Sequence, residues 1–425
     1  MKIKYGWAQR WWPIFLLCSV TLNAQPGRTT LMAPHLKTLQ LKVNGSDERM
    51  PVIKLGSNER LEVSFDDMTH EYRRYTYKIE HCDVEGNVTD GLFESDYVQS
   101  VADEEVIEDY EPSRNTTVLY THYKLTLPNA GLKPLLSGNY RLTVSTDNED
   151  GENETVLQTY FGVVDTKVGI IPQCTTNTEI DRNDKHQQIS MRVDFGSLPL
   201  RDAESEVKTL VLQNRRYDNA VVNAPYTAQD GNVLIWEHTR NLIFKAGNEY
   251  RKMEILSTRY PGMHGDNIRW YDPYYHYTLL QDNPRRNYLY DEDRDGAYIT
   301  RCANSGDANV EADYVVTHFS LASLPMTDSE FYVNGRWTVK GLSPEYKMTY
   351  NEQTEAYEAS ILMKMGYYNY QYLCTKANNP GRGHTASAEG DYYQTENEYD
   401  IMVYYCPTGS RYWQLVGMVT PLYKE

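Results

Sequence analysis

Hydrophobic and polar residues alternate along the first part of the chain. In six segments a hydrophobic side chain recurs at about every second position, which is the pattern of an antiparallel strand with one buried and one wet face. These segments lie at residues 39–43, 61–65, 75–79, 119–127, 140–146 and 156–163. An acidic stretch at 147–154 has the composition of a hairpin turn between the last two. The pattern predicts a domain of about seven strands that ends near Asp165.

The same alternation continues in the rest of the chain. Positions 189, 191, 193 and 195 are hydrophobic and share one face of a strand, and positions 357, 359, 361 and 363 repeat this arrangement. Three segments near the C-terminus, at 366–373, 395–405 and 410–417, are rich in Tyr and β-branched residues and are separated by Gly, Pro, Asn and Ser. Such segments are typical of a small antiparallel sandwich. The clearest boundary before this last group is Ser323-Leu-Pro325.

We therefore predict an all-β fold of three tandem antiparallel β-sandwich domains. The expected boundaries are 25–165 for the N-terminal domain, 166–322 for the middle domain and 323–425 for the C-terminal domain. The C-terminal module also resembles the early-set immunoglobulin-like domains, a group that includes glycogen-binding modules.

The N-terminus has the three regions of a secretory signal peptide. Basic residues precede an apolar run at 11–22, and Ala24 stands before Gln25. We expect cleavage after Ala24, so that residues 1–24 are removed on export. Cys18 follows Leu17, where a lipoprotein signal needs a small residue, and this argues against a lipid anchor. The formal net charge of −17 repels nucleic acid and anionic lipid.

Cysteine and tyrosine usage adds two observations. Five cysteines follow the predicted signal peptide, an odd and sparse set that is no disulfide framework. Cys374 and Cys406 end two strands of one predicted module and either pair or remain free buried thiols. The chain has 37 Tyr against 8 Phe, which suits sheets whose tyrosine rings are buried while the hydroxyls reach water or a backbone partner.

Motifs that carry chemistry are missing from the sequence. There is no nucleophile elbow, zinc-protease motif or phosphate loop. Glu396 and Glu398 lie two positions apart on a predicted strand, but glycosidase carboxylates flank the bond from two sides of a cleft. We therefore interpret them as solvated charges at a strand edge. Asp291–Gly296 resembles the first half of a calcium loop, yet the twelfth position is Cys302. We expect no catalytic residue, metal, cofactor or small-molecule substrate.

An aromatic cluster surrounds a Pro turn between residues 269 and 277. It contains Trp270, Tyr271, Tyr274 and Tyr275. Trp, Tyr and Arg are the usual anchors of protein interfaces, so an exposed cluster of this kind would be a partner-binding surface. The alternative is a loop folded back on its own sheet.

Phrases spread over most of the chain resemble one family. They include Tyr123-Lys-Leu-Thr-Leu-Pro-Asn129, Ser137-Gly-Asn-Tyr-Arg-Leu-Thr-Val144, Gln213-Asn-Arg-Arg-Tyr-Asp-Asn219, Phe244-Lys-Ala-Gly-Asn-Glu-Tyr-Arg251 and the three C-terminal segments. They are similar to the plug proteins of the type IX secretion system. The resemblance implies a non-enzymatic periplasmic protein on the inner side of the outer membrane. Such a protein binds the outer-membrane translocon and seals its pore when no substrate passes.

Two other classes remain open at this point. A carbohydrate-binding accessory protein would use an aromatic platform formed by Trp337 or the Tyr cluster of the last module. A protein that crosses the outer membrane with its alternating strands would share the hydrophobic pattern, and extraction into buffer without detergent would exclude it.

Overall fold

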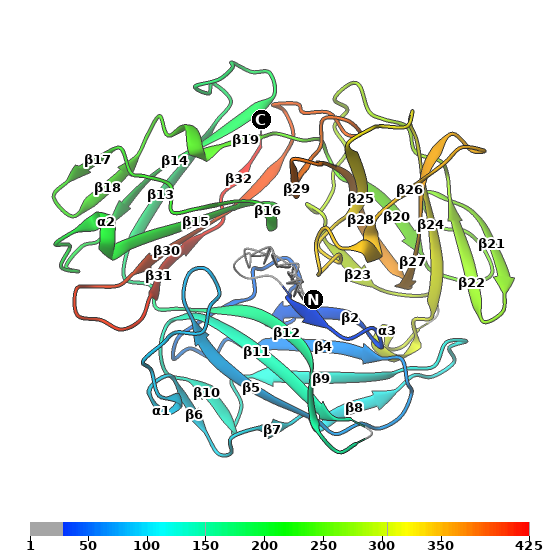
Figure 1. The fold of residues 1–425 in the computed structure, drawn as a ribbon, viewed down its shortest axis with the longest axis horizontal. Helices are drawn as coiled ribbons and strands as arrows, with labels where there is room; N and C mark the ends of the chain where they lie inside the picture. Colours follow the sequence, from blue (N-terminus) through cyan, green and yellow to red (C-terminus); the bar gives the residue numbers. More distant parts are fainter. Residues whose placement is uncertain (1–28, 149, 304, 425) are drawn as a thin grey trace, which may run out of the picture.

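The protein consists of strands arranged in three lobes. The computed structural model describes residues 29–148, 150–303 and 305–424, and the predicted signal peptide at 1–24 lies outside them. Within these described ranges the strands form seven sheets, and each helix is a single turn of three or four residues. The predicted all-β class is confirmed. Figure 1 shows the three lobes around a common centre.

The first lobe contains a six-stranded sheet in the order β1-β12-β11-β5-β7 with β3 beside β12, a four-stranded sheet in the order β2-β4-β9-β8, and the pair β10-β6. Its elements are β1 Leu31–Met32, β2 Leu36–Val43, β3 Val52–Lys54, β4 Leu61–Asp67, β5 Tyr75–Cys82, α1 Glu94–Tyr97, β6 Val98–Ser100, β7 Glu105–Val106, β8 Asp109–Pro112, β9 Thr121–Leu127, β10 Leu132–Pro134, β11 Gly138–Asp147 and β12 Asn153–Val164.

The second lobe contains two five-stranded sheets. One has the order β13-β14-β18-β17 with β19 beside β14, and the other has the order β16-β15-β30-β31 with β32 beside β30. The elements are β13 Gly169–Thr175, β14 His186–Asp194, α2 Ala203–Glu206, β15 Val207–Gln213, β16 Arg216–Val222, β17 Ala228–Asp230, β18 Val233–Trp236, η1 Arg240–Leu242, β19 Ile243–Lys245, β30 Asn397–Tyr405, β31 Gln414–Val419 and β32 Leu422–Tyr423.

The third lobe also contains two five-stranded sheets. In one, β28 pairs with β20, β23, β25 and β29, and the other has the order β21-β22-β24-β27-β26. The elements are β20 Arg251–Ile255, β21 Gly265–Tyr271, β22 Tyr274–Leu279, β23 Tyr298–Thr300, α3 Ala308–Glu311, β24 Tyr314–Ala322, β25 Ser329–Asn334, η2 Pro344–Tyr346, β26 Thr349–Asn351, β27 Ala356–Lys364, β28 Gly366–Lys376 and β29 Asn379–His384.

The third lobe is inserted into the second. Strand β30 pairs with β15 over seven residues, although the whole of the third lobe lies between them in the chain. The sequence pattern places a boundary at residue 323, but β24 and β27 on either side of it are paired in one sheet. Strand pairing thus divides the chain differently from the predicted 166–322 and 323–425, because partners distant in sequence leave no local signal.

Each lobe has its own hydrophobic core. The cores are built around residues such as Phe65 and Leu142 in the first lobe, Trp236 and Val403 in the second, and Phe319 in the third. A smaller cluster around Leu210 and Leu415 continues the packing between the first and second lobes. The junctions between lobes therefore combine apolar burial with the polar contacts described below.

Tyrosine fills many of these cores. Several tyrosines are fully buried, and their hydroxyls find partners inside the protein: Tyr140 donates to the Leu136 carbonyl, and both Tyr370 and Tyr372 donate to Asp282. Phe could not donate these hydrogen bonds, which explains the preference for Tyr in a core with many buried polar groups. The five cysteines of the described residues are all free thiols, Cys374 and Cys406 included.

No helix within residues 29–148, 150–303 and 305–424 has the length and hydrophobicity needed to span a membrane.

Candidate functional site

The four predicted partner-binding residues lie together on one hairpin. Strands β21 and β22 pair so that Trp270 is opposite Tyr275 and Tyr271 is opposite Tyr274. Asp272 and Pro273 form the turn between them. Figure 1 shows this hairpin at the outer rim of the third lobe, far from the centre of the molecule. Strand β21 is the edge strand of its sheet.

The tip of the hairpin is exposed. Trp270 is 45% and Tyr271 is 54% accessible, whereas Tyr274 and Tyr275 are half-buried. The Trp270 ring meets the edge of Tyr275 with centroids 4.9 Å apart. This contact holds the indole in place and leaves much of its surface open to a partner. Tyr274 and Tyr275 are partly covered, as a segment folded back on the sheet would be, whereas Trp270 and Tyr271 are exposed.

A histidine pair continues this surface along the sheet. Tyr271 packs edge-on against His276, which stacks on His318 at 5.0 Å between centroids. His276 Nδ1 lies 2.8 Å from His318 Nε2, and His318 Nδ1 lies 2.9 Å from the Ser360 hydroxyl. Burial and the neighbouring His276 lower the pKa of His318. This lowered pKa favours the neutral form of His318 beside the aromatic tip of the hairpin.

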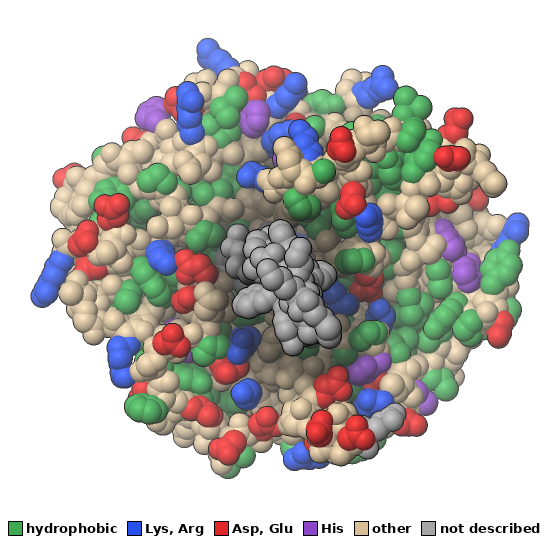
Figure 2. Space-filling model, viewed as in Figure 1, with side chains coloured by type: hydrophobic (Ala, Val, Ile, Leu, Met, Phe, Trp, Pro, Cys, Tyr) green, Lys and Arg blue, Asp and Glu red, His purple; other side chains and the backbone are tan. Residues whose placement is uncertain are grey.

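A cavity of about 190 Å³ lies where the three lobes meet. Figure 2 shows that this face of the molecule is hollowed at its centre. The cavity lining includes Gln40 and Pro51 from the first lobe, Arg215 and Tyr217 from the second, and Arg336 from the third. It is therefore a feature of the junction and belongs to no single lobe.

The side chain of Glu398 lies at this junction and is mostly buried, with 15% of its surface accessible. Its carboxylate binds Arg215 at 3.2 Å and also Arg336, so it connects the second and third lobes. Glu396, two residues earlier, pairs instead with Lys424 at 2.9 Å. The two carboxylates serve separate ion pairs, and the expectation of strand-edge charges in water is wrong for Glu398. Arg215 and Arg336 were missed by sequence reasoning because their partner lies in a distant segment.

Asp66 and Lys364 join the first and third lobes. Lys364 Nζ lies 2.6 Å from Asp66, and both side chains are about 1% accessible. Asp66 also accepts hydrogen bonds from Tyr314 and His122, and the Lys364 ammonium lies 4.2 Å from the centre of the Tyr120 ring. Burial alone would raise the pKa of Asp66, but Lys364 and His122 hold it below the ordinary value. This contact is a buried inter-lobe ion pair.

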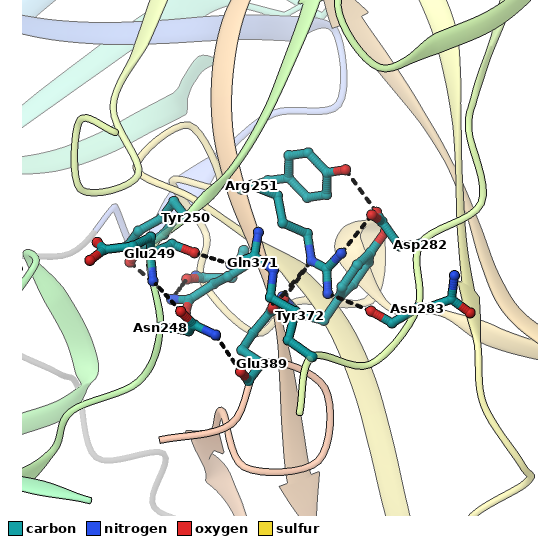
Figure 3. Close-up of polar contacts among 12 residues, drawn as sticks. Asn248, Glu249, Tyr250, Arg251, Asp282, Asn283, Gln371, Tyr372 and Glu389 are labelled. Atoms are coloured by element: carbon teal, nitrogen blue, oxygen red, sulfur yellow. Dashed lines mark hydrogen bonds and ion pairs between the residues drawn. The ribbon is translucent and has the colours of Figure 1, made fainter. Parts of the chain in front are cut away.

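A second buried network holds the two connections of the third lobe. Arg251 binds Asp282 at 2.6 Å and both oxygens of Glu389 at 3.0 and 3.1 Å. Asn248 donates to the Glu389 carbonyl, so the segments that lead into and out of the lobe are tied together. Figure 3 shows these side chains pointing toward one another from strands and loops of the third lobe. Each carboxylate oxygen of Asp282 and Glu389 therefore has at least one polar partner.

The predicted sugar platform is not on the surface. Trp337 is 9% accessible and packs on Phe319, Tyr346 and Tyr368 within the third core. The Tyr-rich strand β28 is covered by neighbouring strands on both edges. Tyr368, Tyr370 and Tyr372 of this strand are buried, so their rings serve packing in the core.

Comparisons with known proteins agree with this architecture. Residues 36–165 match the family model of the type 9 secretion system plug protein 1st domain. A crystal structure of a hypothetical protein from Parabacteroides merdae superposes with a TM-score of 0.89 and 38% sequence identity, and the match covers 94% of this chain and 100% of that one. The collagen adhesin of S. aureus gives a TM-score of only 0.10, too low to bear on the fold. No curated protein matches the sequence.

Fold and surface together define an all-β protein whose lobes are joined by buried ion pairs and which carries exposed aromatic residues, among them Trp270 and Tyr271 of an outer hairpin. The chain belongs to the type 9 secretion system plug protein family, to which its first domain is matched. It is thus a protein associated with type 9 secretion.

Proposed function

We propose that this protein binds the periplasmic side of the outer-membrane translocon of type 9 secretion and seals its pore when no substrate passes. The observation that carries the proposal is the match of residues 36–165 to the plug family. The proposed role is obstruction without catalysis, in the periplasm at the inner side of the outer membrane, with no cofactor and no nucleic acid partner.

The construction of the molecule supports this role. Obstruction needs a body that does not deform into the pore, and each junction between lobes is fastened. Lys364 and Asp66 join the third lobe to the first, Arg336 and Glu398 join the third to the second, and Tyr404 donates to Asn139 between the second and the first. Three fastened junctions around one centre make a closed ring of contacts.

The β21–β22 hairpin is the proposed contact with the translocon. A plug must stay bound when the pore is idle and leave when cargo arrives, so its interface should combine a few aromatic anchors with a polar rim. Trp270 and Tyr271 are such anchors, and Tyr274 and Tyr275 support them from the paired strand. The polar rim is supplied by Arg269, Asp272 and the histidine pair on the same sheet.

Two experiments test the proposal separately. Deleting the gene should raise outer-membrane permeability, and the translocon purified from native membranes should carry this protein. Unchanged permeability together with a translocon that lacks the protein in every state would contradict the function.

The second experiment tests the surface with Trp270→Ala/Tyr271→Ala. Loss of two anchors should weaken binding to the purified translocon by about tenfold or more. Tyr290→Ala is the matched control, because Tyr290 is 54% accessible like Tyr271 and lies away from the hairpin. Equal affinities of the two variants would remove the hairpin from the interface while leaving the function untouched.

A further inference from the structure

A recess rich in basic groups lies between the second and third lobes, where β16 approaches β29. We call it the basic recess. It has a volume of about 340 Å³ and is lined by Ile180, His186, Gln213, Arg216, Asn219, Ile243, Phe244, Lys245, Asn379, Arg382, Gly383, His384 and Thr385. No Asp or Glu is among these described lining residues, although the chain as a whole carries a net charge of −17. Figure 2 shows Lys and Arg side chains gathered on this face near β19 and β29.

The cations around the recess are only partly neutralised. Arg216 binds Asp218 at 2.6 Å, and Lys245 lies 3.2 Å from Asp391. Arg382, which is exposed, forms no ion pair with any residue that the structure describes. Its guanidinium therefore keeps its planar set of donors for a ligand.

The pKa of His384 reflects the charges around the recess. Burial lowers its pKa, and the four cations around it lower it further. The cations around it are Arg216 of β16, Lys245 of β19, Lys376 of β28 and Arg382 of β29, and His186 of β14 also lines the recess. The carboxylates nearby are Asp218, which binds Arg216, Asp391, which lies beside Lys245, and Asp181, which binds His186 at 2.7 Å. Positive charge thus exceeds negative charge at this point of an acidic protein.

We propose that the basic recess binds a small oxoanion, a carboxylate or a phosphate group, through Arg382, Lys245 and His384. Guanidinium and ammonium groups are the usual donors to such anions. Ile180, Ile243 and Phe244 form an apolar wall beside these donors, which suits an anion attached to a carbon chain. The site is independent of the β21–β22 hairpin.

The test measures the imidazole of His384 and the affinity for two probes. The exported protein with ¹³C-labelled histidines is titrated with sodium phosphate or sodium acetate, against sodium chloride at equal ionic strength, and His384→Gln assigns the signal. An anion bound beside the ring should raise the pKa of His384 by about 1 unit. By linkage, the anion should bind more tightly as the pH falls from 7.5 to 5.5, and this pH dependence should weaken in His384→Gln.

Arg382→Gln and Lys245→Gln should each weaken anion binding by about tenfold, since each removes a charge-assisted hydrogen bond. Lys133→Gln is the matched control, because it removes the same charge from an exposed lysine of the first lobe. Saturable binding of phosphate alone assigns a phosphate site, and binding of both probes assigns a general oxoanion site. The proposal is overturned if neither probe exceeds chloride, or if Arg382→Gln and Lys245→Gln behave like Lys133→Gln.

Discussion

Replacing Lys364 by Met tests whether the buried ion pair fastens the first lobe to the third. The substitution keeps an unbranched side chain of similar length but removes the ammonium. Asp66 would remain about 1% accessible, with its charge facing only Tyr314 and His122. Breaking a buried pair from one side costs about 3–5 kcal/mol, because it leaves an uncompensated charge. That is a large part of the about 5–15 kcal/mol by which a domain is stable.

A double-mutant cycle separates the pair from its surroundings. In Asp66→Asn/Lys364→Met both charges are gone, while the amide still accepts a hydrogen bond from Tyr314. The double variant should lose less stability than the sum of the two single variants, with a coupling of about 1–3 kcal/mol. Urea unfolding followed by intrinsic fluorescence measures the free energies of unfolding.

Lys347→Met is the control, since Lys347 and Glu330 form an ion pair whose side chains are 41% and 44% accessible. An exposed pair of this kind contributes less than about 1 kcal/mol. The reasoning is refuted if Lys364→Met costs no more than Lys347→Met, or if the double variant equals the sum of the singles.

Further predictions concern pH and the hairpin. Hydrogen bonds from Thr408 and from backbone N–H groups lower the pKa of Glu206 to about 2. The ionised carboxylate therefore stabilises the folded state above its unfolded pKa, and this stabilisation is lost as the pH falls toward 2. In chemical unfolding, Glu206→Gln should lower the free energy of unfolding by about 1–3 kcal/mol at pH 7 and by much less at pH 2.5. Burial raises the pKa of Asp400 to about 6, so the folded state holds a proton that the unfolded state releases, and stability falls as the pH rises from about 4 through 6. Asp400→Asn does not titrate, so its free energy of unfolding relative to that of the unmodified protein should rise by on the order of 1–3 kcal/mol between pH 4 and pH 8. A difference that stays constant across this range would contradict the assignment. Trp270→Ala/Tyr271→Ala should leave the melting temperature within a few degrees of the unmodified value, because both rings are largely exposed; a large drop in a calorimetric scan would mean that the hairpin supports the fold.

Single strands could be predicted because their signal is local. The alternation at 39–43 falls within β2 and that at 357–363 within β27, since a period of two needs only neighbouring residues. The aromatic cluster around Trp270 could also be predicted, because a Pro turn lies between its aromatic residues in the sequence. Its partner-binding role stays a prediction.

The contacts that fasten the lobes could not be predicted. Asp66 and Lys364 are 298 positions apart, and nothing near either residue marks it as buried. The insertion of the third lobe could not be predicted for the same reason. Strands β15 and β30 pair across the whole third lobe, and no local pattern indicates which distant strand is the partner or in which register it pairs. Glu398 was interpreted as solvated, since a strand residue with polar neighbours looks exposed until its distant Arg partners are placed.

The insertion of the third lobe sets an order of events during biogenesis. Gln213 meets Tyr399 across 186 positions, which a ribosome covers in about 10–40 s at about 5–20 residues per second. Until then β15 has an open edge in the growing chain, and such edges attract other strands. The first lobe can close early, whereas the second waits for nearly the last residues. A chain that ends prematurely in the third lobe would therefore also be unable to complete the second lobe. Until β30 is made, the nascent protein would depend on chaperones that cover the unpaired edge of β15.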